Sequence, residues 1–74
     1  MTKFIVYKQA NARSNFHLSI VLLDREHADK MARYTDEQAH ANGDTEQKSV
    51  VLEYASIYDA PDKITPKQMK ALGG

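Results

Sequence analysis

The sequence predicts an α+β fold in the order ββαβα, with a three-stranded, mainly antiparallel sheet, one long helix on one face and a short C-terminal helix. Three observations predict it: three segments rich in β-branched and aromatic residues, a stripe of small apolar residues at helical spacing, and a helix-capping signature near the C-terminus. A chain of 74 residues has room for one thin core. We therefore expect residues 1–74 to form a single small domain.

The first two strands are expected to form a hairpin. Residues 2–9 carry apolar side chains on both faces, which is typical of a strand that is covered on both sides. The polar residues 10–15 then form a loop, and residues 16–23 return as the second strand. Simple alternation places four apolar side chains of this second strand on one shared face: Phe16, Leu18, Ile20 and Leu22.

A long helix is predicted to follow, with Asp24 as its N-cap, because the carboxylate accepts hydrogen bonds from the free N–H groups of the first turn. Asn42 and Gly43 end the helix, since glycine readily adopts the left-handed conformation of a C-terminal cap. The face expected to pack on the sheet is a narrow stripe formed by Ala28, Met31, Ala32, Thr35 and Ala39.

Residues 48–58 return to strand character, with an expected bulge or bend at residues 55–56 because this segment is long for one strand. A turn then leads to the second helix. Thr65 as N-cap, Pro66 at the first helical position and Gln68 three residues after the cap form a capping box. Ile64 and Met69 occupy the positions of a hydrophobic staple, and the helix is expected to run to Leu72 with Gly73 as its C-cap.

Two strand orders fit this element order. The third strand can lie parallel beside the second, giving order 1-2-3, or antiparallel beside the first, giving order 2-1-3. The first strand is apolar on both faces, and small antiparallel sheets tolerate one open face better than parallel ones. We therefore prefer order 2-1-3.

Composition excludes several classes of protein. The 10 Lys and Arg residues balance the 10 Asp and Glu residues, and the chain has no Cys, so it forms no disulfide, zinc–thiolate site or thiol nucleophile. No apolar run approaches the roughly 18 residues that span a bilayer, and the N-terminus does not resemble a signal peptide. We expect a soluble, cytoplasmic protein without a membrane partner.

No sequence motif indicates catalysis, because the nucleophile elbow G-x-S-x-G and the phosphate-binding glycine loops are all missing. We therefore expect no enzyme, no catalytic residue and no cofactor. His40 lies at helical spacing from Asp36 and Glu37, but two ligands on a helix are weak evidence for a metal site. We interpret these residues as surface charges and expect no bound metal.

A first alternative function is binding of single-stranded nucleic acid. Lys3, Lys8 and Arg13 lie near the expected hairpin, and Tyr7 and Phe16 offer aromatic surfaces on which bases could stack. However, affinity for nucleic acid comes largely from neutralising phosphates, and the net charge of this chain is zero. Nucleic acid is therefore not the expected partner.

A second alternative comes from the last three residues, Leu72, Gly73 and Gly74. They resemble the di-glycine tail of ubiquitin-like and sulfur-carrier proteins, whose β-grasp fold also begins with a hairpin and a helix. The resemblance implies that Gly74 would be activated at its carboxylate. It departs from that family because Thr65 and Pro66 announce a helix for which Gly73 is an ordinary cap.

Protein binding is the function that the sequence favours. A three-stranded sheet with one long helix leaves one face uncovered, and exposed apolar surface of that extent marks an interface. We expect a small, non-enzymatic interaction module, either a homodimer or a compact accessory regulator of the kind carried by bacteria and their phages, which binds a larger target. The expected partner-binding residues on the uncovered face are Tyr7, Tyr54, Tyr58 and Ile57.

Overall fold

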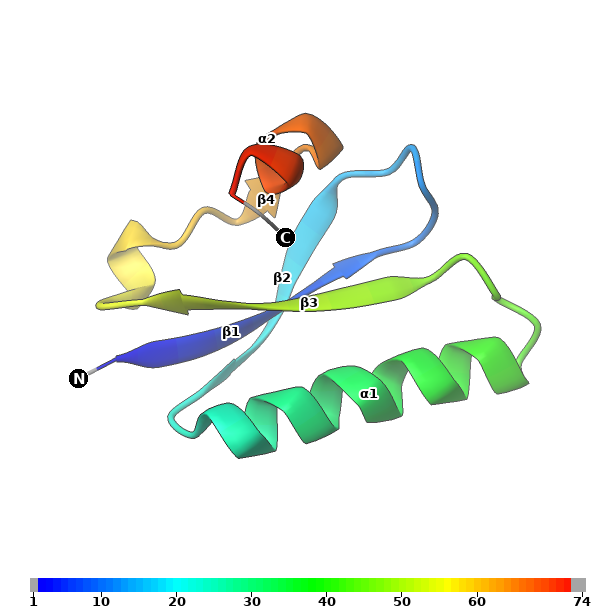
Figure 1. Cartoon of the computed structure of the whole chain (residues 1–74), viewed down its shortest axis with the longest axis horizontal. Coiled ribbons are helices and arrows are strands. Elements are labelled where there is room, and N and C mark those ends of the chain that lie inside the picture. The colour runs from blue at the N-terminus through cyan, green and yellow to red at the C-terminus, as the bar shows by residue number, and fades with distance from the viewer. Residues whose placement is uncertain (1, 73–74) are drawn as a thin grey trace.

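The computed structural model describes residues 2–72 and has three layers (Figure 1). The long helix lies on one side of the sheet, and the C-terminal segment with its short helix lies on the other. The elements are β1 (Lys3–Gln9), β2 (Phe16–Leu22), α1 (Arg25–Ala41), β3 (Lys48–Tyr54), the 3-10 turn η1 (Ile57–Asp59), β4 (Lys63–Ile64) and α2 (Pro66–Ala71).

The sheet is antiparallel throughout and has the order β3-β1-β2-β4. The expected placement of β1 between β2 and β3 is confirmed. The expected number of strands is wrong, because the sheet has four strands rather than three. The additional strand, β4, pairs only Lys63 and Ile64 with the start of β2, and two residues are too few to show an alternating pattern in the sequence.

A β-bulge divides β2 into two halves. Val6 pairs with Ile20 but the next residue, Tyr7, pairs with Leu18, so Ser19 is an extra residue in β2. Beyond the bulge the side chains change face. Phe16 packs with the cluster around Tyr7, whereas Ile20 packs around Val6. The expected single face for the four apolar residues of β2 is therefore wrong. Of the bulge or bend expected at residues 55–56, the structure has a bend at Ala55, directly after the end of β3.

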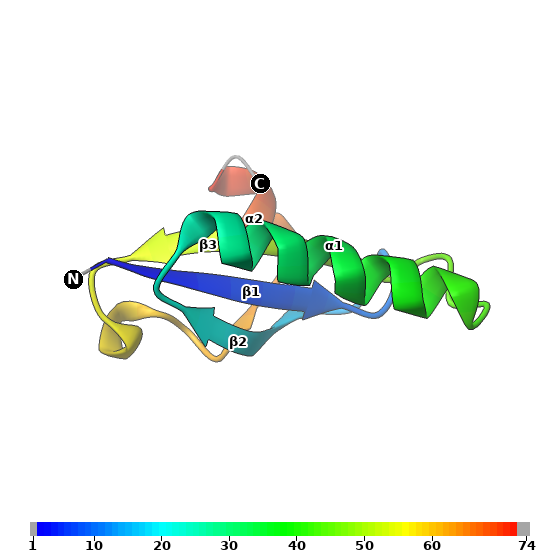
Figure 2. The same ribbon diagram turned by 90° about the horizontal axis from the view of Figure 1, so that it is seen from below.

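The two helices cover different parts of the sheet, as Figure 2 shows for α1. Helix α1 packs mainly on β3 and β1 and less on β2. In this contact Ala28 and Ala32 are buried against Val6 of β1. Asp24 caps its first turn by accepting from the Glu26 N–H, and Gly43 has the positive φ of 91° expected at its C-terminal end. The predicted ends of this helix are confirmed.

The C-terminal segment closes the opposite face. Both hydrogen bonds of the predicted capping box between Thr65 and Gln68 are present. The staple residues Ile64 and Met69 are both 2% exposed and belong to the core cluster around Tyr7. The third strand is shorter than expected and ends at Tyr54. The predicted cap Gly73 lies outside the described residues.

This cover overturns the expectation of an uncovered sheet face. Tyr7 is fully buried, and its hydroxyl donates a hydrogen bond of 2.8 Å to the Pro61 carbonyl, in the segment between η1 and β4. The sequence-based prediction treated residues 59–65 as a turn and a cap, so it left no chain to lie over Tyr7. Tyr7 is a core residue and is not available as a contact residue.

Candidate functional site

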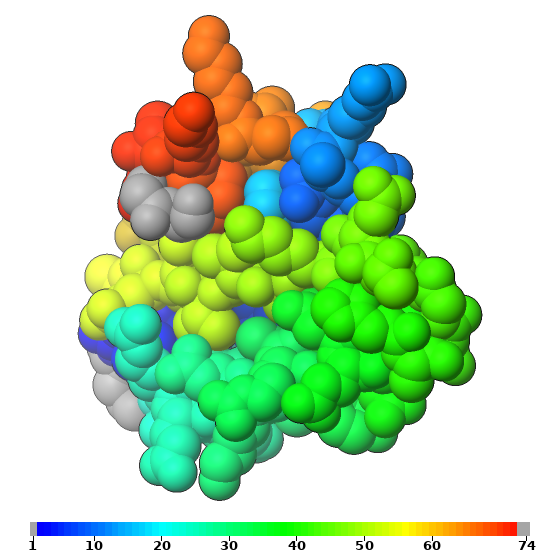
Figure 3. Space-filling view, turned by 45° about the vertical axis from the view of Figure 1, so that its right-hand side comes forward, coloured from blue at the N-terminus to red at the C-terminus, as the bar shows by residue number. Residues whose placement is uncertain are grey.

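The strand β3 forms one edge of the sheet. It pairs with β1 in a regular register over seven residues, and no other described strand lies on its far side. Figure 3 shows β3 as a yellow-green band on the surface, between α1 below and α2 and the β1–β2 hairpin above. The strand has a charge only near its ends, at Lys48 and Glu53, and contains neither proline nor a bulge. Proline and bulges are among the features with which proteins normally protect an edge strand, and β3 has neither.

One helix side chain occupies the start of this edge. The carboxylate of Asp36 accepts the Ser49 backbone N–H at 3.1 Å, the Ser49 hydroxyl at 2.7 Å and the Gln47 side-chain amide at 2.6 Å. All three partners belong to the chain that enters or begins β3, so the carboxylate joins the C-terminal half of α1 to the strand. Asp36 is half-buried and its two oxygens are both engaged.

His40, one turn further along α1, extends this contact. Its Nε2 lies 3.1 Å from the Gln47 carbonyl, and because a carbonyl only accepts, the ring nitrogen donates. Asp36 and His40 therefore act as a pair that holds the strand entrance, not as the free surface charges predicted from the sequence. Within residues 2–72, no group of three acidic or histidine side chains has the arrangement of a metal site.

The Asp36 contact also shows which backbone groups of β3 point outward. In an antiparallel ladder the N–H and C=O of one residue point to the same side, and successive residues alternate between the two sides. The Ser49 N–H points to Asp36 rather than to β1, so Val51 and Glu53 direct their backbone groups outward as well. We call residues 47–49 the occupied part of the β3 edge and residues 51–53 its open part.

An apolar strip lies beside the open part, on the face opposite α1. It consists of Val50, Leu52 and Tyr54, which alternate along β3 and share one face. All three are half-buried and pack against the core cluster that contains Tyr7 and Met69. Because the cover on this face is centred on β1 and β2, the strip keeps part of its surface next to the open backbone groups.

The structure separates the predicted contact residues into different environments. Tyr54 belongs to the apolar strip, whereas Ile57 and Tyr58 lie on η1, beyond the end of β3, with 47% and 93% of their surfaces exposed. Tyr7 lies beside the strip on the neighbouring strand β1, where it pairs with Val50. Its burial, with Tyr54 and Asp62 nearby, raises the pKa of its hydroxyl well above the ordinary value of 10.0. The predicted residues thus do not form one surface.

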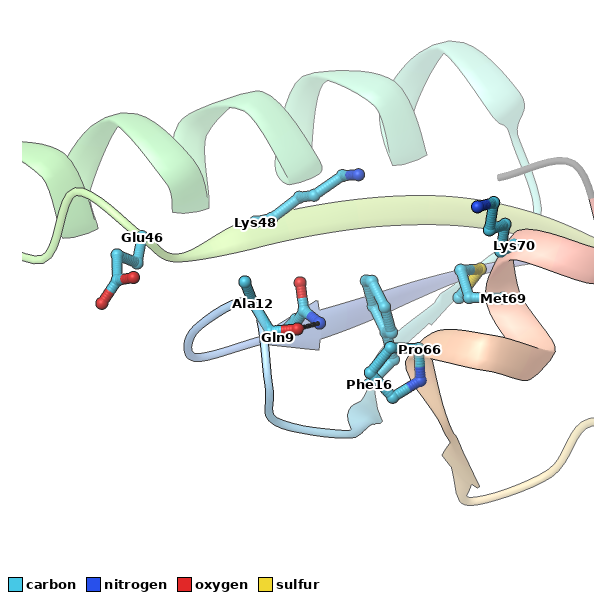
Figure 4. A pocket seen from close by; sticks show the side chains of 8 residues that line it. All are labelled: Gln9, Ala12, Phe16, Glu46, Lys48, Pro66, Met69 and Lys70. Atoms are coloured by element: carbon cyan, nitrogen blue, oxygen red, sulfur yellow. Dashed lines mark hydrogen bonds between the residues drawn. The ribbon is translucent and has the colours of Figure 1, made fainter.

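A shallow depression of about 390 Å³ lies between α2, the hairpin and the start of β3 (Figure 4). The side chains of Phe16 and Met69 form its apolar part, and charged side chains, Glu46, Lys48 and Lys70, surround it. Gln9, the one polar side chain at its floor that is buried, donates to the Ser14 carbonyl at 3.0 Å and so fixes the hairpin loop. Its lining offers neither a hydroxyl nucleophile nor a histidine base.

The two alternative functions depend on residues that the structure places differently. Tyr7 and Phe16, the expected stacking surfaces for nucleic acid, are 0% and 3% exposed and belong to the core. Bases therefore have no access to these rings. The di-glycine tail, Gly73 and Gly74, lies outside the described residues, and the chain before it forms α2.

The chain matches no protein-family model, no curated protein and no solved structure. Neither helix between residues 2 and 72 has the length and apolar character to cross a membrane.

Proposed function

We propose that this protein is a non-enzymatic protein-interaction module that binds its partner by strand addition at the open part of the β3 edge. The observation that carries the proposal is the combination, on one strand, of outward backbone groups at Val51 and Glu53 with the neighbouring apolar strip. In strand addition, backbone hydrogen bonds supply affinity and alternate side chains supply selectivity. The β3 edge offers both elements side by side.

The absence of protection on this edge supports a binding role. Natural proteins protect their edge strands with charges, proline, bulges or covering chain, because unpaired edges recruit other strands. Here Asp36 and His40 cover residues 47–49, while at residues 51–53 Glu53 supplies a charge but no strand or side chain of the described chain pairs with the outward backbone groups. We further propose a cytoplasmic accessory regulator that modulates a larger target, since the chain is small, free of Cys and neutral.

A matched pair of substitutions at Glu53 tests the proposal. Glu53 is exposed and its N–H points outward, so Glu53→Pro removes an edge donor without removing a hydrogen bond to β1. Glu53→Thr removes the same charge but keeps the N–H and suits a strand. We expect wild type and Glu53→Thr, used as baits in affinity purification from the native cell, to retain a partner that Glu53→Pro loses.

Circular dichroism and thermal unfolding provide the control, because all three proteins should keep the same secondary structure and a cooperative transition. A partner that all three baits retain equally would place binding elsewhere on the surface. If none of the three baits retains another protein, the proposed larger target is ruled out.

A further inference from the structure

We infer that the partner on the β3 edge is a second copy of this chain, paired antiparallel about a two-fold axis at Leu52. This inference rests on the proposed function, since it names the occupant of the same edge. It follows from the outward backbone groups that Asp36 leaves free, from the side chains that the pairing brings together, and from the position at which β3 ends.

The hydrogen bond from Ser49 to Asp36 selects the register. Antiparallel pairing of β3 with itself must place outward-facing residues opposite each other: Val51 opposite Val51, Val51 opposite Glu53, or Glu53 opposite Glu53. The last register places like charges directly opposite each other and is unfavourable. The first register needs the Ser49 N–H for the partner copy's Glu53 carbonyl, but Asp36 already holds that N–H. The second register uses only Val51 and Glu53, whose N–H and C=O groups satisfy one another reciprocally.

The side chains fit this second register. Leu52 meets its own copy at the axis, and Val50 lies opposite Tyr54, so the two apolar strips join into one apolar surface. Glu53 lies opposite Val51, and no like charges face each other. Parallel pairing in register would instead place Lys48 beside Lys48 and Glu53 beside Glu53. The net charge of zero adds no general repulsion between copies.

The proposed pairing also stops before it reaches the occupied part of the edge. When Leu52 lies at the axis, Tyr54 of one copy is the last strand residue and lies opposite Val50 of the other. The second copy therefore leaves the strand conformation before it reaches residues 47–49, where Asp36 and His40 stand. The strand length and the position of the helix side chains are thus compatible with a symmetric pair, which is the commonest form of self-association.

Sedimentation equilibrium of the full chain tests the dimer. A pairing that involves one short strand per copy buries a small interface, so we expect reversible dimerisation with a dissociation constant on the order of 10 to 100 μM. Glu53→Pro should weaken dimerisation by about tenfold or more, since it removes an interfacial donor from each copy, while Glu53→Thr keeps the dimer. A wild-type protein that remains monomeric to about 1 mM would overturn the inference, as would a Glu53→Pro dimer of unchanged affinity.

Single cysteines test the register, because the natural chain has none. Leu52→Cys places two thiols directly opposite at the axis, within reach of a disulfide, whereas Val51→Cys places them diagonally apart. We expect rapid oxidation to a covalent dimer for Leu52→Cys only. Preferential cross-linking of Val51→Cys would overturn this register. If either variant unfolds, amide exchange of wild type decides, because Val51 and Glu53 should gain protection with concentration and unchanged exchange would overturn the inference.

The outcomes separate this inference from the proposed function. A monomeric wild type whose bait retains a partner that Glu53→Pro loses would refute the second copy and keep strand addition to another protein. A β3 dimer whose baits retain no other protein would keep the inference and remove the larger target.

Discussion

The two parts of the β3 edge differ in what satisfies their backbone. At residues 47–49, Asp36 and His40 from α1 hold the Ser49 N–H and the Gln47 carbonyl, whereas at residues 51–53 the outward groups have no partner within the described chain. Both parts belong to one continuous stretch of chain beneath one helix. The difference shows that two polar side chains, one helical turn apart, determine how much of an edge strand remains available for pairing.

The largest expected effect comes from Asp36→Ala, which removes the acceptor of three hydrogen bonds at the occupied part. Since hydrogen bonds to a charged group contribute more than neutral ones, we expect a loss of about 2–3 kcal/mol in the free energy of unfolding. Urea denaturation measures the loss. The Ser49 amide should also exchange faster with solvent, which would extend the open part toward the strand entrance.

Asp36→Asn is the matched control for this prediction, because its amide retains one of the two acceptor oxygens. We expect an intermediate loss of stability. Equal stability of wild type and Asp36→Ala would show that the carboxylate does not hold the strand entrance.

A smaller effect is expected from Tyr7→Phe, which acts on β1, beside the apolar strip of β3. At neutral pH the variant loses the hydrogen bond to Pro61, so its free energy of unfolding should fall by about 1 kcal/mol. The pH dependence is more specific. Because the pKa of Tyr7 is raised in the folded state, the neutral hydroxyl stabilises the fold below pH 10.0, and this contribution is lost as the pH rises above that value.

Parallel urea titrations of wild type and Tyr7→Phe between about pH 8 and 11 check this sign. The stability advantage of wild type should shrink above the ordinary tyrosine pKa of 10.0. An advantage that stays constant across that range would indicate that Tyr7 titrates in the folded state as it does in the unfolded chain.

Local sequence signals predicted what local interactions determine. The Thr65 and Gln68 capping box and the left-handed Gly43 depend on neighbouring residues, and both are confirmed. The extra residue Ser19 was missed because a bulge is defined by the partner strand, and simple alternation hides it. The role of Asp36 was missed for the same reason, since its partners Gln47 and Ser49 become neighbours only when α1 packs on β3.

The candidate site was predicted only in part because tyrosine served as the signal for an interface. Tyrosine suits both a core and a contact surface, since it combines a large apolar ring with one polar group. Tyr7 is in the core, and Tyr54 lies at the boundary between core and surface. The signal that would have been useful is the uncharged centre of β3 between Lys48 and Glu53, but it indicates an open edge only once the strand order places β3 outermost.

The smallest effect is expected from His40→Ala, and it sharpens the comparison between the two parts. The exposed His40 side chain donates a hydrogen bond from Nε2 to the Gln47 carbonyl, and loss of this bond should cost about 0.5 kcal/mol, because water can replace it. The more informative readout is dimer affinity. Gln47 lies outside the strand residues that meet in the proposed pairing, so His40→Ala should leave the sedimentation equilibrium of the protein unchanged.

His40→Gln is the control, since its amide N–H can still donate to the carbonyl. If His40→Ala alone strengthened association, the histidine would limit the pairing, and the boundary between the occupied and open parts would be set by His40 as well as Asp36.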